Sequence, residues 1–192
     1  NLSSIATDFV ARQKIGGTHL TYFILKQLPV CSPEIFRNAP LWQQNEESLS
    51  RWVAQRIIEL LYVSWELRLL ACSVDYSGPP FRWDNTRRFS IRCEVDAAFF
   101  HLYDIARDDV DYIMETFPIV KRQDEQAHGE YRTKRVILEL YDAMTEAIRT
   151  GQPYQTRLYP PPGPPINGLP DWPAGSPQPA NWPSHIHSPH RN

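Results

Sequence analysis

Apolar side chains recur at helical spacing along most of the chain, and this rhythm predicts a mainly α fold. Five segments are predicted to be helices with one apolar face each: residues 2–14, 45–72, 84–105, 108–117 and 121–150. Residues 19–28 fit either a helix or a strand, because Tyr22, Phe23 and Ile24 favour strands. The pattern therefore predicts a helical, bundle-like domain.

Glycine and proline mark where these helices end. The Gly16–Gly17 pair is expected to stop the first helix, and Gly151 is expected to stop the last one. Pro118 is expected to close the 108–117 helix. Gly129 is the point at which the last helix would be interrupted, if it is not continuous.

The composition changes sharply after residue 151. Of the 18 prolines, 12 lie in residues 152–192, and such a chain favours extended, largely irregular structure over a packed core. We expect a helical domain over residues 31–151 followed by this Pro-rich C-terminal extension. Four aromatic side chains are candidates to anchor the extension: Tyr154, Tyr159, Trp172 and Trp182.

The charge of the chain is close to neutral but unevenly distributed. The 20 Lys and Arg and 22 Asp and Glu give a net charge of −2. Residues 1–92 carry 11 basic and 8 acidic side chains, whereas residues 93–152 carry 7 basic and 13 acidic ones. A polyanion would therefore bind the N-terminal half, since local potential matters more than the total.

The absence of several sequence motifs constrains both the cellular compartment and the chemistry expected of this chain. The three cysteines are widely spaced, so neither a zinc site nor a disulfide framework is expected, and a cytoplasmic location is the simplest interpretation. No apolar run is long enough to span a membrane. No nucleotide-binding glycine motif, nucleophile elbow or zinc-protease motif is present, and we identify no catalytic residues.

A Gly-Gly turn between cationic side chains is the leading candidate site. Backbone N–H groups in such a turn can bind an anion, and nearby cations can contact the phosphates of DNA. The alternative is an ordinary helix–turn connection with solvated charges, in which Thr18 caps a short second element. The candidate nucleic-acid-binding residues are Arg12, Lys14, Gly16, Gly17, Thr18 and His19.

Three other polar groups are weaker candidates. Arg82, Arg87, Arg88 and Arg92 could contact phosphate, but pairing with acids such as Asp84 and Asp96 is favoured. Residues 121–135 mix both charge signs, which is typical of a solvated face; Arg132, Lys134 and Arg135 as nucleic-acid contacts are the minority interpretation. The three tail histidines fit an incidental role better than a metal site: His185, His187 and His190.

Two stretches of the sequence resemble one enzyme family. Residues 9–30, FVARQKIGGTHLTYFILKQLPV, resemble the closing segment of the target-recognition region in large bacterial adenine-specific DNA methyltransferases. These are the single-chain restriction–modification enzymes and related phage-defence methylases. Residues 81–144 resemble the C-terminal helical region of those proteins, where a helix leads into a Leu-Tyr-Gly turn and then a helix ending in Phe-Pro. Asp104 replaces the turn glycine here.

The resemblance covers about residues 5–160 and implies a function for the whole protein. That protein would methylate a specific DNA sequence, with or without also cleaving it, using S-adenosylmethionine in an upstream catalytic domain. The family's Asn-Pro-Pro-aromatic motif is absent from this chain, so the chain itself is expected to be noncatalytic and to hold no cofactor or metal. Residues 1–30 would end the target-recognition region and contact double-stranded DNA.

Two competing functions stay open. The chain starts at Asn1 and its only methionines are Met114 and Met144, so we expect a piece of a longer protein. Such a piece could instead be a structural module that packs on the parent's catalytic domain without contacting DNA, which the near-neutral charge favours. An independent small enzyme is the third hypothesis, and the missing catalytic constellation weighs against it.

Overall fold

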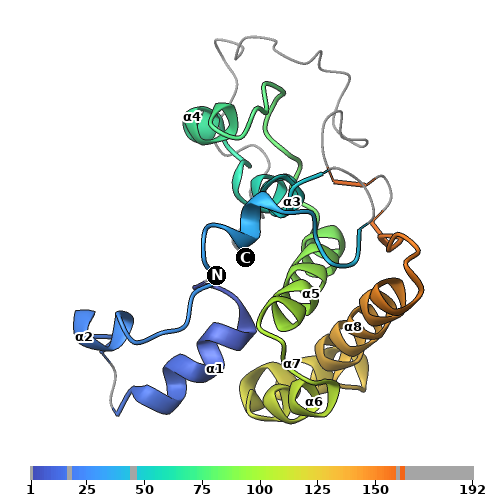
Figure 1. Cartoon of the computed structure of the whole chain (residues 1–192). Coiled ribbons are helices and arrows are strands. Elements are labelled where there is room, and N and C mark those ends of the chain that lie inside the picture. Colours follow the sequence, from blue (N-terminus) through green and yellow to red (C-terminus); the bar gives the residue numbers. More distant parts are fainter. Residues whose placement is uncertain (1, 17–18, 44–46, 159–160, 163–192) are drawn as a thin grey trace. The chain divides into compact units, whose positions relative to one another are not determined.

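The structure is a computed structural model, and it is mainly helical, as predicted (Figure 1). It describes residues 2–16, 19–43, 47–158 and 161–162. No strand occurs among these described residues, and none of their helices is long and apolar enough to cross a membrane. The chain divides into two compact units, which are considered separately: unit 1 with residues 1–45 and 92–154, and unit 2 with residues 46–91 and 155–192.

Unit 1 holds most of the helices, and the boundary between the units falls within one of them. This shared helix is α5 (Asn85–Leu102). The other α-helices of unit 1 are α1 (Ile5–Lys14), α2 (Tyr22–Leu25), α6 (Arg107–Glu115), α7 (Pro118–His128) and α8 (Arg132–Thr150). One turn of 3-10 helix, η1, spans Ile35–Arg37.

The end of unit 1 contains one more helix than the sequence pattern predicts. Pro118 does not simply close α6: it is the first residue of α7, a position where its missing N–H costs nothing. Gly129 has a left-handed φ of 72° and separates α7 from α8, so the predicted 121–150 helix is interrupted there. Gly151, with φ 69°, ends α8 as predicted.

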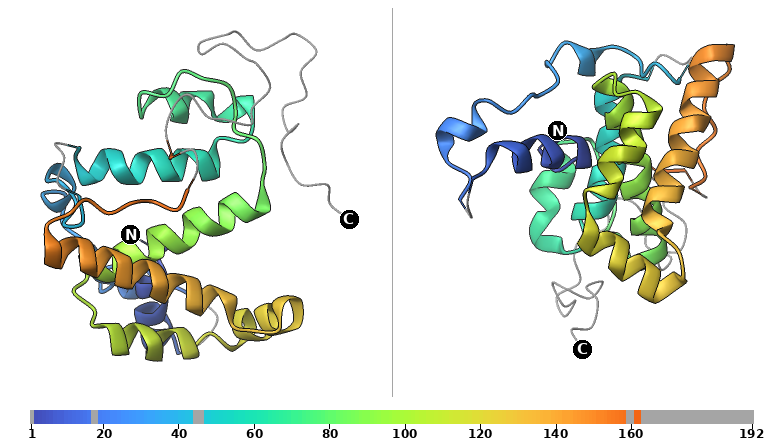
Figure 2. Two further views of the ribbon diagram at one scale, coloured as in Figure 1. Left: turned by 90° about the vertical axis from the view of Figure 1, so that its right-hand side faces the viewer. Right: turned by 90° about the horizontal axis from the view of Figure 1, so that it is seen from below.

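The core of unit 1 lies along the inner face of α8. This helix packs against both α6 and α7 (Figure 2). Its buried side chains are Ile137, Leu140, Tyr141, Met144 and Ala147. Val110, Ile113 and Met114 form the buried face of α6.

Aromatic side chains join α8 and the start of the extension to the rest of unit 1. The His101 ring stacks on Tyr141 with centroids 4.0 Å apart, and its Nε2 lies 3.0 Å from the Tyr141 carbonyl. Tyr154 is buried, and its hydroxyl donates to Glu94 at 2.7 Å, as expected for an anchor. The other three proposed anchors lie outside the described residues: Tyr159, Trp172 and Trp182.

In unit 2 the predicted 45–72 helix is wrong as one continuous element. It is three pieces: α3 (Leu49–Leu61), the 3-10 turn η2 (Trp65–Leu67) and α4 (Arg68–Cys72). The break occurs where the Tyr62 carbonyl accepts a hydrogen bond from Phe81 N–H at 2.7 Å, a long-range bond that a continuing helix would exclude. Ser64 then caps η2 through its hydroxyl.

Unit 2 is held together by a small core rich in aromatic residues and by the ion pair of Arg87 with Glu59. The core cluster comprises Ile58, Tyr62, Ala71, Tyr76 and Phe81. Tyr76 and Phe81 stack with centroids 4.8 Å apart. The guanidinium of Arg87 donates two hydrogen bonds to the buried Glu59 carboxylate, one of them 2.9 Å long. Such a pair is costly to break because either partner alone would be an uncompensated charge.

Candidate nucleic-acid interface

The start of α1 is held by side chains of two other segments of unit 1. The Ser4 hydroxyl accepts a hydrogen bond from Thr7 N–H and acts as the N-cap. Asp96 on α5 accepts one from Ile5 N–H at 2.9 Å. An acid at this end is favoured because a helix N-terminus carries partial positive charge. These bonds fix the direction of α1 and thus the position of its basic C-terminal turn.

Arg12 is engaged inside unit 1. Its guanidinium forms two hydrogen bonds with Asp8, of 2.9 and 3.1 Å, from one helical turn away. The same group lies over the Phe117 ring, 4.8 Å from the centroid. Both side chains of the ion pair are about half exposed. Of the predicted phosphate contacts, Arg12 therefore has the least spare positive charge to offer.

The other candidate residues are more open. Lys14, Gly16 and His19 are exposed, whereas Gly17 and Thr18 lie outside the described residues. Gly16 does not adopt a positive φ, and a Cβ added there would have no atom within 4 Å. Its position therefore does not require glycine. Thr21, not Thr18, caps the next helix, accepting from Ile24 N–H.

The helix ends on either side of this turn offer little attraction to an anion. α1 ends here, with Ile15 as its C-cap, and a helix C-terminus carries partial negative charge. α2 is a single turn of four residues and adds almost no dipole. The helices therefore add little to the attraction of a phosphate, which side chains can supply. The role of the Gly-Gly turn as an anion cradle stays a prediction, because Gly17 lies outside the described residues.

The surrounding sequence supplies that charge. No acidic residue occurs between Asp8 and Glu34, and this acid-free segment, residues 9–33, carries Arg12, Lys14 and Lys26. It also includes His19. Lys26 Nζ lies 4.7 Å from the centroid of the Tyr22 ring. The segment is thus a continuous positive stretch in a chain whose net charge is −2.

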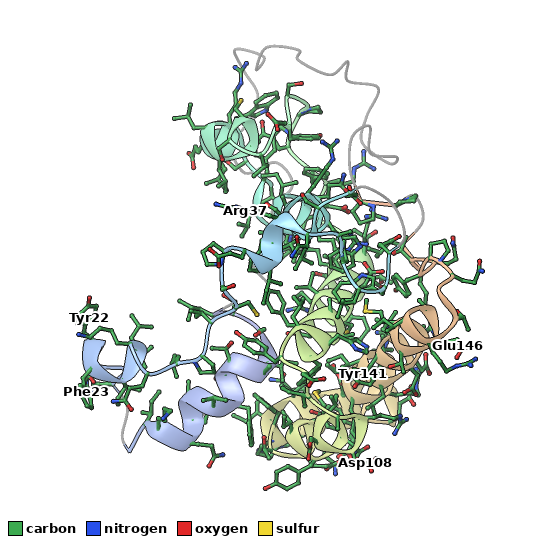
Figure 3. All side chains as sticks on the ribbon, in the orientation of Figure 1. Tyr22, Phe23, Arg37, Asp108, Tyr141 and Glu146 are labelled. Atoms are coloured by element: carbon green, nitrogen blue, oxygen red, sulfur yellow. The ribbon has the colours of Figure 1, made fainter. Side chains whose placement is uncertain are left out.

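Part of this segment also displays apolar side chains to solvent. Residues 19–30, the arm, carry four of them: Leu20 (49% exposed), Tyr22 (72%), Phe23 (72%) and Val30 (56%). Figure 3 shows Tyr22 and Phe23 at the outer end of unit 1, pointing away from its other helices. In the sequence these rings predict only secondary structure. The combination of aromatic residues with a long acid-free stretch is the signal that could have identified them as binding residues.

The arm is tied down where it rejoins the unit. Leu28 is buried, and the Tyr103 hydroxyl donates to the Pro29 carbonyl at 3.1 Å. α2 also contacts α1. The exposed rings therefore project from a segment that is anchored at its end.

Several cations of α6, α7 and α8 differ from those of the arm because acids neutralise them. Lys134 bridges Asp111 and Glu115, with Nζ–O distances of 2.9 and 2.6 Å. Hydrogen bonds from Lys121 and Lys134 lower the pKa of Glu115. Arg135 is paired in the same way with Glu130 and Glu139. Residues 121–135 thus form an ion-paired solvated face, as their mixed charge indicated.

Two of the arginines of residues 82–92, Arg87 and Arg88, are also engaged, and their side chains bind partners that the sequence does not suggest. Arg87 binds Glu59, and Arg88 donates to the Leu60 carbonyl at 2.7 Å. Asp96 binds the Ile5 backbone, and burial raises its pKa to about 7, while the charge of Arg92 lowers it. The expected Arg–Asp96 interaction is therefore electrostatic at most, and the hydrogen bond goes to the backbone.

A cavity in unit 2 lacks, among the described residues that line it, the paired nucleophile and base that a catalytic site would need. It has a volume of about 370 Å³ and is lined in part by Ser48, Ser73 and Asp75. Two of its three lining serines bond to the backbone: Ser48 caps α3, and Ser73 donates to the Leu70 carbonyl. No histidine or cysteine lines it among the described residues, so it offers no nucleophile–base pair.

Metal-binding and thiol chemistry were considered as well. In the described part of the chain, His, Cys, Asp and Glu form no group of three or more that could hold a metal ion. Burial raises the pKa of the Cys93 thiol to about 12, which leaves it unreactive. The tail histidines lie outside the described residues: His185, His187 and His190. The acid-free segment is therefore the strongest candidate site.

Comparison with known proteins gives no reason to prefer another candidate site. No model of a known protein family matches the chain, and neither a curated protein sequence nor a solved structure is significantly similar to it.

Proposed function

We propose that this chain is the noncatalytic C-terminal part of a bacterial DNA-modifying enzyme and that its acid-free segment contacts double-stranded DNA. The parent is a cytoplasmic adenine-specific methyltransferase of the restriction–modification type. Its upstream domain binds S-adenosylmethionine and performs the methylation. Lys14, His19 and Lys26 position the phosphate backbone, and the helices of residues 31–151 support the segment.

One observation carries the proposal. Within the described part of unit 1, the segment that resembles the end of a target-recognition region carries the exposed Lys14 and Lys26 and no acid of its own, whereas Lys134 and Arg135 of α8 are paired with acids. Contact between such cations and phosphates releases condensed counterions, which is the main source of affinity for DNA of any sequence.

A second observation supports the resemblance itself. Asp104 occupies the place of the glycine in the family's Leu-Tyr-Gly turn, and it has a left-handed φ of 52°. Ile105 N–H donates to the Phe100 carbonyl across this turn, which is the closure found at helix ends that normally use glycine. The replacement therefore keeps the backbone geometry that a glycine would have.

The direct test is fluorescence anisotropy of the chain with a labelled mixed-sequence duplex over a salt series. Lys14→Glu should weaken binding several-fold and reduce the salt slope by about one. Arg122→Glu is the matched control, since it makes the same charge change at an exposed position of α7. Equal weakening by both variants, or no binding at low salt, would contradict the proposal.

A structural module without DNA contact is the second candidate, and a separate feature favours it. The α4 region of unit 2 exposes Leu67, Leu69 and Leu70, with Leu69 at 85%. Exposed apolar clusters of this kind mark protein interfaces. Under this alternative, Leu69→Asp should abolish binding of the chain to the parent's upstream domain, while Lys14→Glu should leave that binding unchanged.

A further inference from the structure

We propose that the arm reads DNA through its aromatic side chains, with Phe23 and Tyr22 stacking on bases at an opened base step. This inference rests on the proposed function and adds base contact to the phosphate contact assigned there. The target is duplex DNA that is locally deformed.

The exposure of the two rings is the first support. Tyr22 and Phe23 are consecutive residues of α2 and each is 72% exposed. Aromatic side chains gain most by burial, so two exposed neighbours at an outer position mark a surface that binds something. The Thr21 cap and the buried Leu28 hold α2 in place. Rings presented from an anchored turn lose little conformational freedom when they bind.

The charge around the rings selects the partner. Lys26 Nζ lies over the Tyr22 ring, and no acid occurs from residue 9 to residue 33. Lysine is depleted from the buried cores of protein interfaces, whereas single-stranded and unstacked nucleic acids are bound by aromatic platforms inside positive surfaces. A nucleic acid matches both the exposed rings and the positive charge, since its bases stack on the rings and its phosphates accept hydrogen bonds from the ammonium.

The kind of contact follows from the position of the rings. Side chains at the end of a projecting turn can act as a wedge that enters between base pairs and unstacks them. Pyrimidine–purine steps open most readily. Binding should therefore be tighter to a duplex with a central TA step than to one in which a stiff A-tract replaces that step.

The test uses a duplex whose TA step carries a fluorescent adenine analogue that brightens when it is unstacked. The wild-type chain should bind and raise this fluorescence. Phe23→Ala should bind about tenfold more weakly, with an unchanged salt slope and no rise in fluorescence. Ile119→Ala is the matched control, because Ile119 is an exposed apolar side chain of the same unit, at 61%, and it should behave as wild type.

Failure of this inference can be distinguished from failure of the proposed function. Salt-dependent binding without any fluorescence rise, or a rise that survives Phe23→Ala, would overturn the stacking role and leave phosphate contact in place. Absence of binding at low salt would overturn both. If Phe23→Ala left DNA binding intact but abolished binding to the upstream domain, the arm would be a protein-docking surface instead.

Discussion

Unit 1 contains two basic regions whose charges are arranged in opposite ways. In α6–α8 the ammonium of Lys134 lies between two carboxylates, and Arg135 has two acidic partners of its own. The acid-free segment has no internal acid at all, and its Arg12 is paired with Asp8 just outside it. The difference teaches that the number of cations in a region says little about binding; what matters is whether acids lie within reach.

The two regions also differ in how far their apolar side chains are buried. α8 hides its apolar face against α6 and α7, whereas the arm displays Tyr22 and Phe23. Exposed ion pairs contribute little to folding, so the stability of α6–α8 comes from buried apolar area. The arm has no such core and depends on a few anchors, Leu28 among them.

The largest expected effect is the difference in stability between truncating a buried side chain in α8 and truncating an exposed one in the arm. Met144→Ala in α8 removes a fully buried side chain and should lower the free energy of unfolding by about 2 to 5 kcal/mol. Phe23→Ala should change it by less than about 0.5 kcal/mol. Denaturant unfolding measures both, and a large loss in Phe23→Ala would show that the arm is part of the core.

A pH-dependent effect should appear at Asp96 of α5, which holds the start of α1. The folded state holds a proton on Asp96 up to its pKa of about 7, whereas the unfolded chain releases it near pH 4. The folded state thus binds more protons in this window, so the free energy of unfolding falls as pH rises from about 4 to 7.

We expect this fall to be on the order of 2 kcal/mol, less than the full shift would give, because Asp96 is only partly buried. Asp96→Asn keeps an oxygen that can accept from Ile5 N–H, so it should remove the pH dependence. The exposed Asp109→Asn should leave the pH dependence in place. Unfolding curves at several pH values measure this dependence. If the free energy of unfolding of Asp96→Asn fell with pH as steeply as that of wild type, the assignment to Asp96 would be wrong.

A smaller effect is expected at the turn that leads into the paired region. Asp104 holds a left-handed φ of 52°, which side chains rarely adopt. Asp104→Gly should relieve this strain and raise the free energy of unfolding by up to about 1 kcal/mol. Gly129→Ala is the reciprocal control, since it introduces a side chain at φ 72° and should destabilise. Destabilisation by Asp104→Gly would mean that the carboxylate contributes more than the backbone strain costs.

The smallest effect concerns the Gly-Gly turn. Gly16 has neither a positive φ nor a close neighbour, so Gly16→Ala should leave stability and DNA affinity within about 0.5 kcal/mol of wild type. Anisotropy and unfolding measurements check this. A marked loss of DNA affinity would favour the turn as an anion cradle and shift the site away from the side chains of the arm.

The sequence predicts the helices well where one local rule decides, and fails where a distant residue decides. Gly151 ends α8 as its conformational freedom implies. No glycine or proline predicts the break after Leu61, because the break depends on the hydrogen bond that the Tyr62 carbonyl accepts from Phe81 N–H. Glu59 as the partner of Arg87 was equally unpredictable, since the two residues are far apart in the chain.

The candidate site shows the same limit. The Asp8–Arg12 pair has the i, i+4 spacing of helical ion pairs, so the engagement of Arg12 could have been predicted. The exposure of Tyr22 and Phe23 could not, because aromatic residues are usually largely buried and only the three-dimensional structure shows that these are not.

The central claim is that the arm and its preceding turn, not α6–α8, meet the DNA. Backbone amide chemical shifts, followed by NMR while a mixed-sequence duplex is added, test it residue by residue. The account predicts changes in Lys14, His19 and residues 20–26, with α8 unchanged. Changes centred on α8, or none anywhere at low salt, would contradict it.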